Sequence, residues 1–448
     1  MTKNENFVKL NRSDFLFFAM DSIITSLTQL ITLRFKEKHD VDEIKLALRY
    51  LMTLYPRFRS VVQPTLFSYG IKVIDQDDRK VDILFQEAFK VKRNISLSSD
   101  QYDNLRRDML NEPFSLEMSF PIRFCYLPDD PKPVLLISLH HIAGDGMSWF
   151  HFTNALLAHL NGKKISEVPL DNSGVTPALI DDPFYKIPFQ FLKSLKRFVT
   201  DIGRSKGEKI IRPSIQPADF YGPVNSYYHV INYDIPTILS ISRTLGCSIT
   251  VLFMASLARA IIKKSGNKKG NVIGMLVSFD LRPYFKKNKP VLGNFVRAFM
   301  IKIHEKYFND PMQIIEQINT QLKEFQKQLN NREILFPWML DCLYMLMGKK
   351  LYSRAISRAR KKGLYPITCQ VSNLGNLDPL NTNGENAQLC EAIATVPVYG
   401  IFMTITGLDG KFVSNFSYPE AEFTKDEIVD YVKCFENELG NYVIASSS

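Results

Sequence analysis

The apolar positions of the chain follow a helical period near its start. In residues 41–55, VDEIKLALRYLMTLY, apolar side chains recur three and four positions apart. This spacing places them on one face of a helix. Asp40 is a suitable N-cap, and Pro56 disfavours a further helical turn. The pattern therefore predicts an amphipathic helix over residues 41–55.

A different pattern, that of a buried strand, appears at residues 134–139, where the run VLLISL is short and mostly apolar. The Gly-Asp-Gly sequence at 144–146 then predicts a turn. The segment MSWFHFTNALLAHL that follows predicts a helix ending at the Asn-Gly pair of residues 161–162. The sequence therefore predicts a strand–loop–helix unit, with His140 and His141 where the strand stops.

Strand and helix patterns alternate through both halves of the chain, which is typical of α/β layers. Residues 161–226 carry seven prolines and a basic amphipathic stretch, and they predict the connection between the halves. The second half has strand patterns at YYHVINYDI, NVIGMLVSFDL, ITCQVSNLG, GIFMTITGLDG and KFVSNFSYP, and helix patterns at ITVLFMASLARAIIKK and residues 424–437. We expect an N-terminal lobe over 1–175, a connection over 176–225 and a C-terminal lobe over 226–448.

The composition is that of an ordinary globular protein. Its 448 residues exceed the size at which a single core stops growing, about 250–300 residues, so two domains are expected. The formal charge of +10 suits anionic lipid, a phosphorylated coenzyme or solubility alone. Nucleic acid is not expected as a partner, because the basic residues form no recognisable binding motif with aromatics. The six dispersed cysteines argue against a zinc or redox site and favour a reducing, intracellular environment.

The sequence shows neither a signal peptide nor a run of 18 apolar residues, so we expect a cytoplasmic protein without a membrane span. Residues 336–363 nevertheless combine an apolar stretch with seven basic residues. This combination fits a surface that rests peripherally on a membrane or a roof over an apolar channel. It equally fits a helix pair packed on the core with a solvated basic end.

The adjacent histidines are the strongest candidates for chemistry. Neighbouring residues of a strand point to opposite faces, so one of His140 and His141 faces the interior and the other a cleft. Two rings so placed cannot easily share a metal ion, and no metal site is expected. A neutral imidazole can accept a proton, so one histidine could be a catalytic base. From these residues alone, a purely structural role is about equally well supported.

The motif HHIAGDG at residues 140–146 is similar to the H-H-x-x-x-D-G motif of the condensation-domain and coenzyme A-dependent acyltransferase superfamily. Further segments resemble the family in its own order: VDEIKLALRYLMTLYPRFRS, NEPFSLEMSFPIRFCYL, VSFDLRPYF with LGNFVRAF, and QVSNLGNL. The last resembles the alcohol acetyltransferase, polyketide-associated and wax ester synthase branches. The chain lacks the Asp-Phe-Gly-Trp-Gly segment of the plant branch, and no Pro follows Asn373 as it does in typical wax synthases.

This resemblance implies an α/β fold of two chloramphenicol-acetyltransferase-like lobes with mixed sheets, V-shaped, with an active-site tunnel between the lobes. It implies that His141 is the general base and that His140 is structural. Asp145 is placed with His141 in the catalytic group, pairing with Arg282 to hold the loop in shape. Gly146 is expected to let the backbone pass close to the substrate channel.

The second lobe contributes further expected site residues. Ser372 and Asn373 are expected near the channel, either as donors to a developing oxyanion or as a turn held by side-chain hydrogen bonds. Gly293 and Asn294 are expected to form a structural turn.

The resemblance implies an acyltransferase that moves an acyl group from a thioester to a lipid-like or polyketide-like alcohol by direct attack with His141 as base. Acyl-coenzyme A or an acyl carrier protein would be the co-substrate, and no bound cofactor is expected. The alternatives are amide formation with an amine acceptor by a free-standing condensation domain, and a non-catalytic module that binds a carrier protein. The chain offers no G-x-S-x-G elbow and no phosphate loop that would favour another chemistry.

Overall fold

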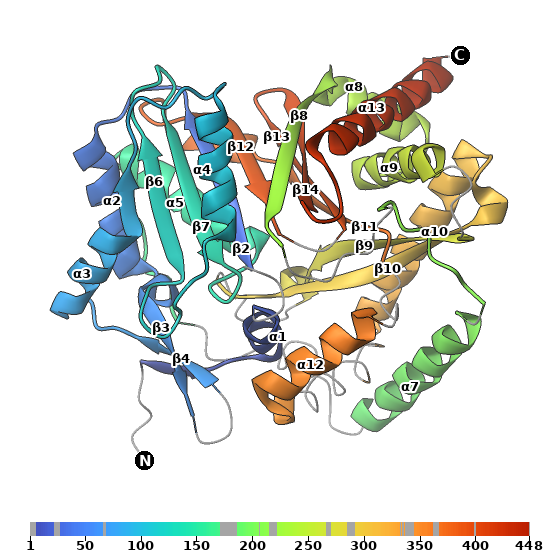
Figure 1. Cartoon of the computed structure of the whole chain (residues 1–448), viewed down its shortest axis with the longest axis horizontal. Helices are drawn as coiled ribbons and strands as arrows, with labels where there is room; N and C mark the ends of the chain where they lie inside the picture. Colours follow the sequence, from blue (N-terminus) through green and yellow to red (C-terminus); the bar gives the residue numbers. More distant parts are fainter. Residues whose placement is uncertain are drawn as a thin grey trace.

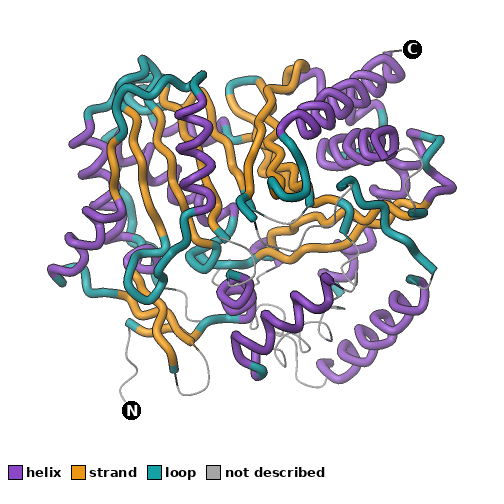
Figure 2. The backbone as a smooth tube through the Cα atoms, viewed as in Figure 1, coloured by secondary structure: helices purple, strands orange, loops and turns teal. Residues whose placement is uncertain are grey.

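The protein is represented by a computed structural model, and two α/β lobes lie side by side in it (Figure 1). The structure describes residues 6–21, 27–65, 69–170, 186–205, 207–214, 222–265, 270–284, 292–331, 333, 336, 345–361, 367–397 and 400–447. Each lobe is built around its own sheet, and the two sheets appear as separate groups of strands in Figure 2. The expected two-lobed α/β fold with mixed sheets is confirmed.

The N-terminal lobe contains a five-stranded sheet of order β12-β2-β7-β6-β5. The strands are β2 (Thr28–Phe35), β5 (Phe89–Val91), β6 (Ile122–Leu127), β7 (Val134–His140) and β12 (Leu389–Thr395). Only the β5–β6 pair is parallel. Apolar side chains of α2 (Val41–Leu54), α3 (Arg79–Ala88) and α5 (Gly146–Leu160) pack on one face, and those of α4 (Asp100–Asn111) pack on the other.

Local sequence signals fix the ends of these elements. The predicted helix over 41–55 is α2, and Pro56 begins the short 3-10 helix η1 (Pro56–Arg59) after it. Asp40 is its N-cap residue, although its side chain makes no capping hydrogen bond. The predicted strand–loop–helix unit is β7 followed by α5, which ends before Asn161 as expected.

The C-terminal lobe contains a six-stranded sheet of order β10-β9-β11-β13-β14-β8. The strands are β8 (Val224–Asp234), β9 (Val272–Asp280), β10 (Val296–His304), β11 (Cys369–Asn376), β13 (Ile401–Leu408) and β14 (Lys411–Pro419). β11 pairs in parallel with both neighbours, and the other pairs are antiparallel. One face packs on α8 (Ile235–Thr244), α9 (Ile249–Ser265), α10 (Pro311–Asn330) and α13 (Lys425–Ser447).

The last helix, α13, runs ten residues beyond the predicted end at 437. Gly440 interrupts the apolar pattern there. A side chain at this position would begin 2.8 Å from the hydroxyl of Tyr233 on β8. The glycine therefore permits close packing of helix on strand and does not end the helix.

Strand β12 ties the two lobes together. It comes from the C-terminal half of the sequence, yet it pairs antiparallel with β2 at the edge of the N-terminal sheet. Thr404 and Thr406 of β13 donate hydrogen bonds to the carbonyls of Ala394 and Ala392 on β12. The strand therefore belongs to one sheet by its backbone and contacts the other through side chains.

A smaller third layer lies at the edge where both lobes meet (Figure 1). It contains the sheet β1 (Phe7–Lys9), β4 (Tyr69–Val73) and β3 (Ser60–Pro64), together with helices α1 (Arg12–Met20) and α12 (Gly348–Lys361). Helix α7 (Ile187–Arg204) lies within the expected connection. The remaining short 3-10 helices are η3 (Arg282–Tyr284), η4 (Glu305–Tyr307) and η5 (Asp378–Asn383).

Two sequence features fall partly outside the described residues. Residues 337–344, which hold Cys342 and much of the apolar stretch of 336–363, lie outside them. The other five cysteines are free thiols. In the described chain, no single helix is long and apolar enough to cross a membrane, and only the bent pair of α8 and α9 passes that test together.

Candidate active site

The two histidines at the end of β7 face different surroundings, as the strand geometry predicts. His140 is fully buried, and its Nδ1 accepts a hydrogen bond from the backbone N–H of Ile142 at 3.0 Å. Its Nε2 therefore carries the hydrogen and lies 3.3 Å from Asp21 Oδ1. His140 is thus a packed group that shapes the loop.

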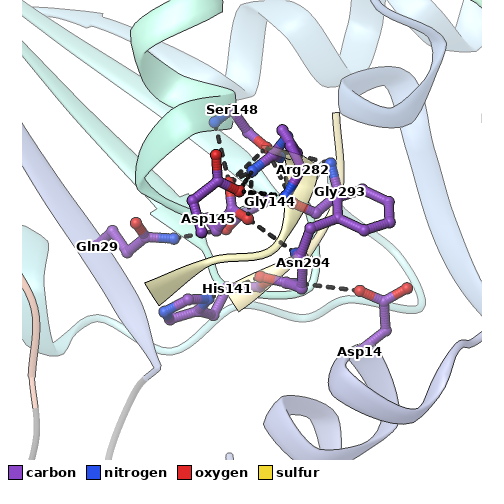
Figure 3. Close-up of polar contacts among 11 residues, drawn as sticks. Asp14, Gln29, His141, Gly144, Asp145, Ser148, Arg282, Gly293 and Asn294 are labelled. Atoms are coloured by element: carbon purple, nitrogen blue, oxygen red, sulfur yellow. Dashed lines mark hydrogen bonds and ion pairs between the residues drawn. The ribbon is translucent and has the colours of Figure 1, made fainter. Parts of the chain in front are cut away.

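His141 is half-buried and is held on two sides. Its ring stacks on Phe17 of α1, with centroids 3.7 Å apart and planes 9° from parallel. Its Nδ1 lies 3.0 Å from Oδ1 of Asn294, which comes from the C-terminal lobe (Figure 3). The imidazole therefore lies between a helix of the first half and a loop of the second.

The amide of Asn294 determines which ring nitrogen of His141 carries hydrogen. Its Nδ2 donates to Asp14 Oδ1 at 2.8 Å and to the backbone carbonyl of His141. Both of these partners only accept, so the amide oxygen must face the ring. An amide oxygen also only accepts, which places the hydrogen on Nδ1 and leaves the Nε2 lone pair available.

Asp14 is itself held in place by Arg57. The carboxylate is 2% exposed, and its Oδ2 lies 2.6 Å from Nη2 of Arg57. The same guanidinium donates two hydrogen bonds to the carbonyl of Ile142, one residue after His141. The contacts therefore run from Arg57 to Asp14, to Asn294 and then to His141, and we call these four residues the Asp14 relay.

Burial sets the charge state of His141. Loss of solvation lowers the pKa of its imidazole to about 4, although the Asn294 hydrogen bond and the charge of Asp145 act in the opposite direction. The ring is therefore neutral at physiological pH. A neutral ring with hydrogen on Nδ1 presents Nε2 as a base.

Asp145 and Arg282 form the ion pair that the resemblance implies. The two side chains make bidentate contacts of 2.9 Å, and both are buried. Asp145 also accepts from the backbone and hydroxyl of Ser148 and from the backbone of Phe295. Arg282 contacts Asp280 at 2.9 Å as well. We call this group the Asp145 clasp, and it joins the histidine loop to the second lobe.

These contacts define what Asp145 does. Its oxygens are engaged by Arg282, Ser148 and Phe295, and no hydrogen bond between Asp145 and His141 occurs among the described residues. Burial lowers the pKa of Arg282, but the charges and hydrogen bonds of Asp145 and Asp280 together outweigh burial, so the pKa is raised. Asp145, expected in the catalytic group, is thus a positioning residue.

Gly146 lies against a strand of the C-terminal lobe. A side chain there would begin 2.9 Å from Cδ2 of Leu374 on β11. Cys369 and Val371 pack into the core of the C-terminal lobe, so the alternation along β11 turns Ser372 and Leu374 to the opposite face. The hydroxyl of Ser372 is half-buried and makes no hydrogen bond within the described chain.

Asn373 points the other way and stabilises a turn. Its Nδ2 donates to Thr250 Oγ1 at 3.0 Å on α9, and its Oδ1 accepts from the backbone of Gly375 at 2.9 Å. Gly375 has a φ of +77°, a conformation that favours glycine. Of the two alternatives for Asn373, these contacts fit the turn held by side-chain hydrogen bonds.

Three residues near His141 were missing from the sequence-based site or carried another role. Asp14 and Arg57 were not expected there, and Asn294 was expected only in a structural turn. The segments LGNFVRAF and PRFRS, which resemble the family, contain Asn294 and Arg57 and were the available signal. In the described chain, no group of three His, Cys, Asp or Glu residues could hold a metal ion.

Known proteins share this fold. The trichothecene 15-O-acetyltransferase of Fusarium sporotrichioides superposes with a TM-score of 0.68 at 12% identity, covering 97% of this chain and 94% of that one. The first condensation domain of the CDA synthetase gives 0.69 at 11% identity over 98% and 97%. The epimerization domain of the third module of tyrocidine synthetase B gives 0.63 at 13% identity over 98% and 96%.

The comparison of sequences is narrower than that of structures. No match is found among curated proteins. The sequence model of the Condensation domain matches residues 18–172, which contain both histidines and Asp145. The resemblance to the Condensation domain is thereby confirmed for residues 18–172, and the chain has the fold of these structural neighbours along nearly its whole length.

Proposed function

We propose that this protein is an acyltransferase that moves an acyl group from a thioester to an alcohol, with His141 as the general base. One observation carries the proposal: the Asp14 relay holds a neutral imidazole with its Nε2 lone pair available. The other histidine of the motif, His140, is fully buried and uses its Nδ1 to accept from the backbone of Ile142. Condensation-domain proteins are acyl-transfer enzymes, which supports the reaction class.

The reaction follows from the state of that nitrogen. Nε2 of His141 takes the hydroxyl proton of the acceptor as its oxygen attacks the thioester carbonyl carbon. The new C–O bond gives a tetrahedral oxyanion, for which the hydroxyl of Ser372 is the candidate donor. Collapse breaks the C–S bond, and the departing thiolate takes the proton back from Nε2. Thioester and alcohol thus become ester and thiol.

The alcohol acceptor is favoured by the segment QVSNLGNL, which resembles the branches that acylate alcohols. A structural neighbour is an O-acetyltransferase by name, which is compatible with it. The amine acceptor is the second candidate, because condensation domains of peptide synthetases share the fold equally well. Either coenzyme A or a carrier protein fits as the donor of the acyl group.

The test is thiol release from acetyl- to palmitoyl-coenzyme A and from the same acyl groups on a carrier protein. Each donor would be offered with an alcohol mixture, an amine mixture or no acceptor. Release should require the alcohol mixture, and His141→Ala should lower it by about 10²–10⁴-fold. His159→Ala, near the far end of α5, is the matched control and should leave the rate unchanged.

The outcomes separate the alternatives. Thiol release that occurs only with the amine mixture would show that the acceptor is an amine and not an alcohol. Equal release by the native protein and His141→Ala would refute the assigned base. Tight binding of the carrier protein without turnover on any donor would support the non-catalytic module.

A further inference from the structure

Large apolar side chains gather on two helices away from the active site. Thirteen such side chains are exposed on the described surface, and six of them lie on α7, on α12 or in the two residues before α12. The six and their exposed fractions are Phe189 (73%), Leu192 (60%), Val199 (60%), Leu346 (82%), Met347 (42%) and Leu351 (52%). A concentration of this kind marks an interaction surface more often than scattered residues do.

On α7 the exposed apolar residues share one face with a basic residue, Lys196. Phe189, Leu192, Lys196 and Val199 are spaced three or four positions apart and are all exposed. The opposite face packs inward, where the ring of Phe198 lies 5.1 Å from that of Phe336. The outer face of α7 is therefore both apolar and positively charged.

On α12 and in the two residues before it, exposed apolar and basic residues occur together. Leu346 and Met347 precede the helix. The helix itself carries Lys350, Leu351, Arg354 and Arg358, and all six residues are exposed. The helix contains no acidic residue, and α7 contains only one, at 201. Basic residues therefore outnumber acidic ones on both helices.

We propose that the outer faces of α7 and α12 form a surface that binds an anionic membrane. Both helices lie along the same edge of the molecule (Figure 1), away from the two large sheets. Amphipathic helices with basic and large apolar side chains bind at the headgroup region, where the apolar groups enter the acyl boundary and the cations meet anionic lipid. Side chains as exposed as Phe189 and Leu346 project outward, as insertion into lipid requires.

The inner face of α12 connects this surface to the active site. Tyr352 packs on Phe15 of α1 with ring centroids 6.1 Å apart, and Lys349 Nζ lies 3.8 Å from the ring centroid of Phe18. The same helix α1 carries Phe17 and Asp14, which hold His141 and Asn294. A protein docked in this way would hold its site one helix layer from the lipid, where an apolar acyl donor or acceptor would be concentrated.

The experiment measures flotation of the purified full chain with vesicles and needs no turnover, so it stands apart from the proposed function. Vesicles of phosphatidylcholine alone are compared with vesicles of phosphatidylcholine and phosphatidylglycerol. One variant removes charge, with Lys196→Gln, Lys350→Gln and Arg354→Gln. A second removes apolar contact, with Phe189→Ser, Leu192→Ser, Leu346→Ser and Leu351→Ser. The control is Leu46→Ser with Ile83→Ser, exposed apolar residues of the N-terminal lobe.

The native protein should float with the anionic vesicles and much less with the neutral ones, and added salt should release it. The charge variant should bind about five-fold more weakly for each cation removed. The apolar variant should also lose binding, while the control should bind like the native protein. Melting curves of all variants confirm that they fold.

Three results would overturn the proposal. The first is no flotation of the native protein with anionic vesicles. The second is a control variant that loses binding as much as the apolar variant does. The third is a native protein that does not bind vesicles but binds an acyl carrier protein through these side chains. The surface would then be a protein-docking site.

Discussion

Two buried aspartate–arginine pairs flank the His141 loop, and they differ in which groups contact the two carboxylate oxygens. In the Asp145 clasp, Arg282 takes both carboxylate oxygens, and Ser148 and Phe295 donate to them as well. In the Asp14 relay, Arg57 lies against one oxygen, and the other accepts from Asn294. Among the described residues, the clasp makes no hydrogen bond to the His141 ring, whereas the relay reaches the ring through Asn294.

This difference separates two kinds of support for a reacting group. The clasp fixes where the loop lies relative to the second lobe, because it joins residues of both lobes. The relay fixes the hydrogen of the ring, because the Asn294 amide nitrogen donates to Asp14 and its oxygen therefore faces Nδ1 of His141. Loss of the clasp should therefore disturb the fold first, and loss of the relay should disturb the reaction first.

The largest effect is expected from Asp145→Ala. It removes the bidentate partner of the buried Arg282 guanidinium, and removal of one member of a buried pair costs about 3–5 kcal/mol of unfolding free energy. Chemical denaturation followed by circular dichroism measures this change. The control is Asp82→Ala, whose exposed pair with Arg49 should contribute about 1 kcal/mol or less. A clasp variant as stable as the control would contradict the structural role.

The next effect concerns the relay itself. Asn294→Ala should lower kcat about 100-fold, because the ring then loses the contact that selects its hydrogen position, with KM nearly unchanged. The fold should lose only about 1–3 kcal/mol. The paired change Asp14→Asn with Asn294→Asp exchanges amide and carboxylate and should restore part of kcat. Equal recovery in stability but none in kcat would contradict the relay.

The clasp residues Asp145 and Arg282 were predicted from the sequence because they lie in recognisable local motifs. The run at 134–139, the Gly-Asp-Gly turn and the helix after it lie within one stretch, and the resemblance supplied Arg282. Asp14 carried no such signal, since a lone acidic residue on a short helix is usually solvated. Only the folded chain brings Arg57 and Asn294 to it and makes its burial tolerable.

The fold shows the same division. Elements with strong periodicity, such as α2 and β7, were predicted close to their observed ends. The strand at 389–395 was not predicted, and its alternation alone could not show which sheet it joins. Pairing with β2 is decided by contacts between residues distant in sequence.

The pH dependence of kcat/KM reports the protonation of the His141 ring. Because burial holds the pKa of His141 near 4, the base form persists on acidification, and the rate should stay flat from about pH 7.5 to about pH 5.5. In the exchanged variant a carboxylate lies beside the ring and favours its protonated form. The acid limb should therefore move to higher pH. A native acid limb near the ordinary histidine value of about 6.5 would contradict the desolvated ring.

The smallest effect is expected from Gly146→Ala, which tests whether the clasp alone sets the distance between the lobes. The new methyl group would meet the flexible end of Leu374, so the loss of unfolding free energy should be about 1 kcal/mol or less. The added change Leu374→Ala should relieve that contact. A thermal-melting cycle over the four proteins measures the coupling, and its absence would place the lobes farther apart than described.

The most direct measurement of the central claim is the ring ¹⁵N spectrum of His141 in protein labelled at histidine. Comparison with His141→Gln assigns its signals among the seven histidines. At neutral pH we predict a neutral ring with hydrogen on Nδ1 and none on Nε2, and a loss of that preference in Asn294→Ala. A ring with hydrogen on Nε2, or one that is doubly protonated at neutral pH, would contradict the assignment of His141 as the base.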